Sequence, residues 1–126
     1  MKRIAAAVIL LTLLAFGCFS AYRYVVHTTA QLDAAAGQVL SDLKCGDFPA
    51  ARQQMDQGYR LWHNKRRPLS ALVRHNELDD IDRLYQRTRQ ALDNEDLDEA
   101  LLQLRELRTI LLHLPEMEAP SYSNIL

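Results

Sequence analysis

An uncharged apolar stretch opens the chain, and the sequence after it alternates apolar and polar positions with helical spacing. The stretch covers residues 4–21, reads IAAAVILLTLLAFGCFSA and carries no charged side chain. As a helix it would be about 27 Å long, close to the hydrocarbon thickness of a bilayer. Charged and aromatic residues flank it, namely Lys2, Arg3, Tyr22, Arg23 and Tyr24. This arrangement predicts a single transmembrane anchor.

Four later segments place apolar residues at i, i+3, i+4 and i+7, the spacing of an amphipathic helix. They cover residues 32–43, 48–62, 69–93 and 97–114. The first segment begins soon after the anchor. The anchor and this segment can therefore form either one continuous helix or two separate helices.

The residues between these segments carry the signals that end and start helices. Gly46 is a helix stop, and Asp47 can cap the next helix. Pro68 disfavours helix at the residue before it, so the chain should turn there and the third helix should follow. Asp96 and Glu99 form a capping-box pattern for the fourth helix.

A short internal sequence repeat, which we call the internal echo, supports an arrangement of two helical hairpins. The spaced pattern Leu43…Asp47-Phe48-x-x-Ala51-x-x-x-Met55 recurs 49 residues later as Leu92…Asp96-Leu97-x-x-Ala100-x-x-x-Leu104. Each copy is the corner of an αα-hairpin, and two such hairpins make a four-helix bundle. The expected fold is all-α: an N-terminal transmembrane helix followed by an antiparallel up-down bundle of about four helices.

The expected boundaries are residues 1–27 for a cytoplasmic start and anchor, 28–114 for the bundle and 115–126 for an irregular tail. Basic residues lie mainly before the anchor, so the positive-inside rule predicts a single-pass protein of the cell membrane with a cytoplasmic N-terminus and an extracytoplasmic bundle. Two other fates of the anchor stay open. It can be cleaved as a signal peptide, or Cys18 after Gly17 can accept a lipid.

Charge and cysteine content narrow the function classes. The chain has 15 basic and 16 acidic residues, and from His27 onward 12 basic and 16 acidic. That balance argues against a nucleic-acid binder. We expect no intrachain disulfide between Cys18 and Cys45, while a bridge between chains through Cys45 stays open. Neither cysteine nor histidine spacing fits a metal site, so no metal or cofactor is expected.

Several residues are candidates for chemistry or contact. Trp62 ends the apolar seam of the second helix, where it either closes the core or offers a ligand platform. His75 and Asp79 lie one turn apart and suit either a base with its orienting carboxylate or a structural pair. Because no nucleophile accompanies that pair, we favour the structural interpretation of His75 and do not expect an enzyme.

Two charged runs lie near these candidates. The basic corner should sit at the turn after Trp62 and return to the bilayer surface; it comprises Lys65, Arg66 and Arg67. The acidic run is most simply a solvated helix face; it comprises Glu77, Asp79, Asp80 and Asp82.

The fourth helix has a broad apolar arc, widened by Leu101, Leu102, Ile110 and Leu112. Such a helix is either well buried in its own fold or contacts a partner. His113 projects from the opposite side, toward solvent or a partner.

The order of these features resembles an uncharacterised bacterial family, the domain-of-unknown-function family 4363. The matching pieces are the basic start and anchor, Trp62, His75-x-x-Leu78-Asp79-x-Ile81, Asp96-x-x-x-Ala100, Leu112-His113-x-Pro115-Glu116 and Asn124-Ile125. The resemblance implies a small anchored helical protein, mostly of Gram-positive bacteria. It implies no activity, cofactor or catalytic residue, and draws attention to Trp62, His75 and His113.

The sequence thus favours a membrane-anchored helical domain that works by contact, as an adaptor or envelope assembly module with a protein partner or a second copy of itself. The alternative is a sensor of a small molecule or ion, with a pocket near Trp62, His75 and Tyr85.

Overall fold

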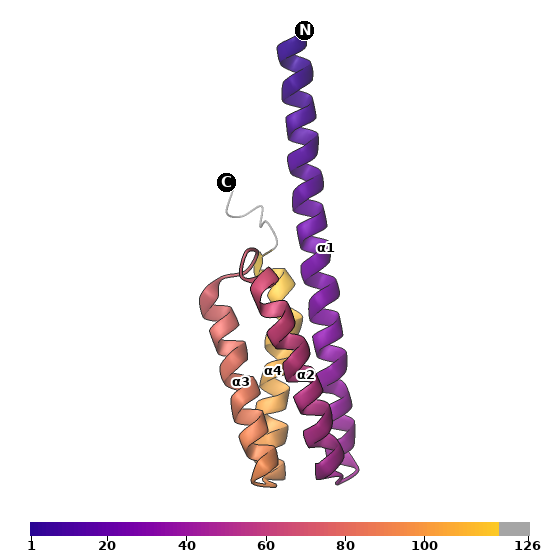
Figure 1. Cartoon of the computed structure of the whole chain (residues 1–126), viewed down its shortest axis with the longest axis vertical. Helices are drawn as coiled ribbons and strands as arrows, with labels where there is room; N and C mark the ends of the chain where they lie inside the picture. The colour runs from indigo at the N-terminus through magenta and orange to yellow at the C-terminus, as the bar shows by residue number, and fades with distance from the viewer. Residues whose placement is uncertain (119–126) are drawn as a thin grey trace.

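Four helices make up the part of the chain that the structure, a computed structural model, describes, which is residues 1–118 (Figure 1). They are α1 (Lys2–Lys44), α2 (Phe48–Leu69), α3 (His75–Asp93) and α4 (Leu97–Glu118). Helix α1 packs against α2 and α4, and α3 packs against α4 and less closely against α2. Successive helices run in opposite directions (Figure 1). The predicted all-α, up-down bundle is confirmed.

The predicted anchor and the predicted first bundle helix are one continuous helix, α1. It has 43 residues and is therefore about 65 Å long. Residues 1–20 are exposed along their whole length, whereas one face from Val25 onward is buried in the bundle. Residues 18–36 contain neither glycine nor proline, so nothing in that segment interrupts the backbone hydrogen-bond ladder. By length and composition, this helix could cross a membrane.

The two turns predicted from the internal echo have the same backbone structure. At the first, the Gly46 N–H donates to the Leu43 carbonyl and the Asp47 N–H to the Asp42 carbonyl. At the second, Glu95 and Asp96 donate in the same way, to the carbonyls of Leu92 and Ala91. These paired bonds define a Schellman motif, which satisfies carbonyls at a helix end.

The residue at the centre of each motif adopts a left-handed conformation, with φ of +74° at Gly46 and +51° at Glu95. Each turn then starts the next helix with an aspartate cap. The carboxylate of Asp47 accepts from the backbone N–H of Ala50, and that of Asp96 accepts from the N–H of Glu99. The echo thus encodes two copies of one helical corner.

Two prolines do not end helices where the sequence analysis placed the ends. Helix α2 continues through Pro68 to Leu69, so α3 begins at His75 rather than near residue 69. Helix α4 likewise contains Pro115 and continues to Glu118, so residues 115–118 of the expected irregular tail are helical, and the rest of that tail lies outside the described residues.

The physical reason is that proline in a last turn removes one backbone bond without ending the remaining ladder. Beyond Pro68, the Ser70 N–H donates to the carbonyls of Arg66 and Arg67, and the Ser70 hydroxyl donates to Arg67 as well. Leu69 is fully buried and Leu114, just before Pro115, is too. Burial of these leucines favours the longer helices.

The core follows the predicted stripes of all four helices. Its largest fully buried side chains are Trp62, Tyr85, Leu32, Leu43, Met55, Leu69, Leu78, Ile81, Leu92, Leu104, Leu107 and Leu111. Leu97, which was expected in the stripe of the fourth helix, is exposed because it is the first residue of α4.

Substituting the left-handed residue of each corner motif should change the stability of the fold in opposite directions at the two turns. Glu95→Gly should raise the free energy of unfolding by about 0.5–1 kcal/mol, because a non-glycine residue in the left-handed region is strained. Gly46→Ala should lower it by about 1 kcal/mol for the same reason. Denaturant unfolding of the full chain in detergent, followed by circular dichroism, measures both.

Glu95→Gln is the control, since it keeps the strained backbone and removes only the exposed ion pair with Arg52, which spans 3.6 Å. That pair should contribute about 0.5 kcal/mol or less. If Glu95→Gly were destabilising like Glu95→Gln, the strain would not be the dominant effect at this turn.

Candidate functional site

The structure brings all seven candidate residues of the sequence analysis to one end of the bundle. We call this the near end: it lies beside Tyr24 of α1 and contains the α2–α3 connection and the last turns of α4 (Figure 1). The far end contains the α1–α2 and α3–α4 turns. The candidates occupy the end of α2, the start of α3 and the end of α4; they are Trp62, Lys65, Arg66, Arg67, His75, Asp79 and His113.

A polar network joins α2 to α3 at the near end. The indole N–H of Trp62 donates to Asp82 Oδ1. Arg66 donates from Nε to Asp82 Oδ2 at 2.6 Å and from Nη2 to Asp79 Oδ1 at 2.8 Å. The hydrogen bond to Asp82 is the main cause that raises the pKa of Arg66, whose cation is thereby stabilised. Asp82 therefore ties two α2 side chains to α3.

Trp62 itself is part of the core. None of its side chain is exposed, and its ring stacks on that of Tyr85 with centroids 6.0 Å apart and planes 18° apart. Tyr59 meets Tyr85 edge-on, and the Arg89 guanidinium lies 4.7 Å from the Tyr59 ring centre. Aromatic and cation–π contacts of this kind add to the stabilisation from burial.

The sensor pocket expected near Trp62, His75 and Tyr85 does not match this geometry. Tyr85 is also buried, and burial raises the pKa of its phenol. Its hydroxyl has no hydrogen-bond partner among the described residues. His75 is exposed at the first residue of α3. The two rings are stacked and buried between α2 and α3, so a ligand could reach them only by displacing core packing.

The expected pairing of His75 with Asp79 is replaced by the bond from Arg66 to Asp79. The acidic run is correspondingly not a plain solvated face. Asp79 and Asp82 bind Arg66, and Asp80 pairs with Arg83 at 3.1 Å. The sequence analysis missed this because the partner Arg66 lies on another helix, and its register was not known.

The basic corner is helical, since Lys65, Arg66 and Arg67 lie in the last turns of α2 and not in a turn. The three side chains have different surroundings. Arg66 is held by the two aspartates, Lys65 Nζ lies 5.9 Å from the centre of the Tyr24 ring, and Arg67 is exposed.

Helix α4 is neither wholly buried nor wholly outward-facing. Its stripe packs into the bundle, while Leu101 and Ile110 are half-buried. Leu102 and Leu112 are 51% and 56% exposed. His113 is also exposed, next to Leu112. The broad apolar arc therefore reaches the surface.

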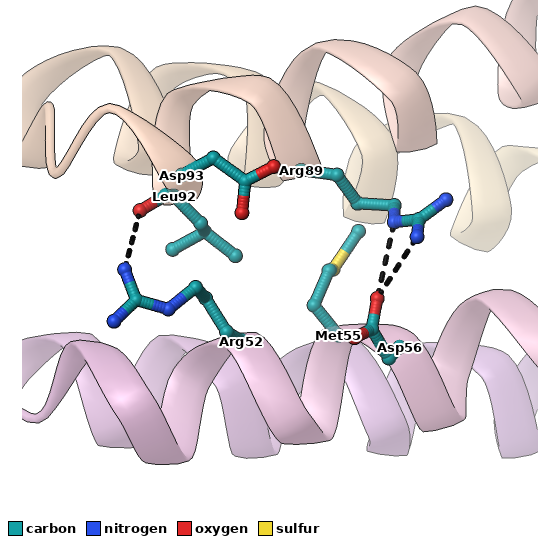
Figure 2. Close-up of a pocket in the computed structure, with 6 residues that line it drawn as sticks. All are labelled: Arg52, Met55, Asp56, Arg89, Leu92 and Asp93. Atoms are coloured by element: carbon teal, nitrogen blue, oxygen red, sulfur yellow. Dashed lines mark hydrogen bonds and ion pairs between the residues drawn. The ribbon is translucent and has the colours of Figure 1, made fainter.

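A second site, which the sequence analysis missed, lies between α2 and α3 toward the far end. It is a cavity of about 260 Å³ lined by Arg52, Met55, Asp56, Arg89, Leu92 and Asp93. Figure 2 shows Arg52 donating to the Leu92 carbonyl on one side, at 3.2 Å, and Arg89 bonded to Asp56 on the other, at 3.1 Å.

The cavity has two cationic and two anionic side chains, so its charge favours neither an anion nor a cation. A repeated spacing in the sequence marks it: Arg52 precedes Asp56 by four residues, and Arg89 precedes Asp93 by four. On antiparallel helices these patterns face each other with opposite charges. The cavity forms only because the register between α2 and α3 places the two patterns opposite each other.

The edge between α1 and α4 has one further ion pair. Arg108 donates from Nε and Nη2 to the two carboxylate oxygens of Asp33, at 2.9 and 3.3 Å. Its guanidinium lies over Gly37, where a Cβ atom would be 3.5 Å from Nη2. The part of the chain that the structure describes has no cluster of three metal-ligating side chains.

Replacing Trp62 tests whether it is a core residue. Trp62→Ala should lower the free energy of unfolding by about 3–5 kcal/mol, because it removes a fully buried ring. Trp62→Phe should cost less, about 1–2 kcal/mol, since a ring remains and Asp82 keeps its bond from Arg66. Urea unfolding of the full chain measures both. A loss below about 1 kcal/mol for Trp62→Ala would instead favour the ligand platform.

Comparison with known proteins agrees with the family suggested by the order of features along the sequence. No curated protein and no solved structure matches the chain significantly. A family model does match, described as Domain of unknown function (DUF4363), over residues 19–125. The match includes the end of the apolar segment and all four bundle helices. The chain therefore belongs to the DUF4363 family.

Proposed function

We propose that this protein is a membrane-anchored contact module, which holds a small helical bundle at a fixed height and orientation above the surface of a cell membrane. The observation that carries this proposal is the continuity of α1. Its exposed apolar residues continue without a break into the helix that packs against α2 and α4. A rigid connection of this kind suits an adaptor or assembly protein that must present one face to a partner.

The apolar segment supports the anchor because its side chains have no other cover. Residues 4–19 include nine large apolar side chains that are at least 58% exposed; these are Ile4, Val8, Ile9, Leu10, Leu11, Leu13, Leu14, Phe16 and Phe19. Exposure on this scale is costly in water and favourable in lipid. The basic residues before it favour a cytoplasmic N-terminus and an extracytoplasmic bundle.

The surface of α4 is the best-supported contact face. Leu102 and Leu112 project from it, and neither is covered by the other described helices. The partner is a protein of the same membrane or a second copy of the chain. The sensing alternative is less well supported, because the rings of Trp62 and Tyr85 are already packed against each other.

Labelling of Cys45 tests the orientation. Cys45 is exposed at the far end, whereas Cys18 lies in the apolar segment. In a Cys18→Ser chain, a membrane-impermeant maleimide added to intact cells should modify Cys45. A chain whose sole cysteine comes from Lys2→Cys should react only after lysis. The reverse labelling pattern would place the bundle in the cytoplasm. A separate measurement, the intact mass of the purified chain, distinguishes an uncleaved anchor from a cleaved or lipid-modified one.

Photo-crosslinking tests contact through α4. A photoreactive residue at Leu102 or Leu112 should yield one discrete crosslinked species in native membranes, identified by mass spectrometry as a partner or as a second copy. The same residue at the exposed positions Gln53 and Gln57 of α2 is the matched control. Equal crosslinking at all four positions, or none from α4, would contradict the proposed contact face.

A further inference from the structure

The register between α1 and α2 sets the level of the α2–α3 connection. Lys65 lies against the Tyr24 ring, and a Cβ atom on Gly58 would lie 3.7 Å from Ala35, so the two helices are antiparallel. Beyond Lys65, α2 continues for four residues to Leu69. That adds about 6 Å toward the N-terminus of α1. Residues 70–74 therefore lie level with about residues 20–24 of α1, where the apolar segment ends.

Internal ion pairs occupy three aspartates of α3 at this end. Asp79 and Asp82 bind Arg66, Asp80 binds Arg83, and the carboxylate of Glu77 is half-buried. The remaining cations are differently placed. The described residues include no ion pair from Lys65, Arg67 or Arg74, and Arg23 lies 6.0 Å from the centre of the Phe19 ring.

These cations lie at the end of the bundle that is nearest to the apolar part of α1. Lys65 comes from α2 beside Tyr24, Arg67 is exposed one half-turn later, and Arg74 is exposed immediately before α3. The end of α2 and the α2–α3 connection thus both bring positive charge to this end of the bundle. Among the described residues, the part of the chain beyond this end is the N-terminal part of α1, which is exposed and mostly apolar.

We propose that the near end of the bundle docks on anionic phospholipid headgroups, through Lys65, Arg67 and Arg74. The inference rests on the proposed membrane anchor and adds a second contact to it. Lipid phosphates complement these cations, and the anchor holds them within a Debye length of the headgroups. Docking fixes the tilt of the bundle, because contact on the α2–α3 side of α1 resists rotation away from the surface.

The test is amide hydrogen exchange of the full chain in nanodiscs. Neutral phosphatidylcholine discs are compared with discs that also contain phosphatidylglycerol. Amides of residues 70–74 should exchange about tenfold more slowly in the anionic discs. Amides of the far-end turns, residues 45–47 and 94–96, should exchange equally in both. High salt should remove the difference.

The triple variant Lys65→Gln, Arg67→Gln, Arg74→Gln should lose the protection. The matched control removes three exposed cations away from the near end, by Lys44→Gln, Arg87→Gln and Arg105→Gln, and should keep it. Circular dichroism confirms that both variants fold.

Equal exchange of residues 70–74 in both kinds of disc would overturn the docking and leave the anchor standing. Protection that persists in the triple variant would also overturn it, as would protection by inorganic phosphate in neutral discs. A chain that enters neither disc would overturn the anchor and the docking together.

Discussion

The unbroken backbone of α1 is the constraint on which the rest of the structure depends. A helix without glycine or proline over residues 18–36 has every internal N–H and carbonyl paired, so bending it there would break bonds that nothing else replaces. The buried stripe from Val25 to Leu43 therefore has a fixed rotational position relative to the apolar segment. Helices α2 and α4 pack on that stripe, and α3 reaches it only through them.

The four edges of the bundle are held together by different interactions. Within the α1–α2 hairpin, Gly58 permits a close approach to Ala35, and the core leucines are buried on both sides. The α2–α3 edge is wider, since Trp62 and Tyr85 stack there and arginines bridge the outer surface. Ion pairs on such an exposed edge contribute little each, so the buried rings account for most of its stability.

This division separates structural residues from candidates for contact. Trp62 and Asp79, two residues that carry the family resemblance, belong to the network that joins α2 to α3. Their neighbours Leu78 and Ile81 are fully buried in the same region. These four residues therefore maintain the fold. Side chains that point outward, such as Leu112, remain available for contact.

Sequence alone determined the four helical segments of the bundle, the apolar segment, the buried stripes and the two aspartate-capped corners, because these depend on spacing and on residues close together in the chain. Tertiary structure decided the remaining features. The extension of α2 past Pro68 depends on burial of Leu69, and the partners of Arg66 come from another helix. The cavity between Arg52 and Arg89 likewise exists only once the register of two antiparallel helices is set. Local patterns carry no information on that register, since it is fixed by how side chains distant in sequence fill the common core.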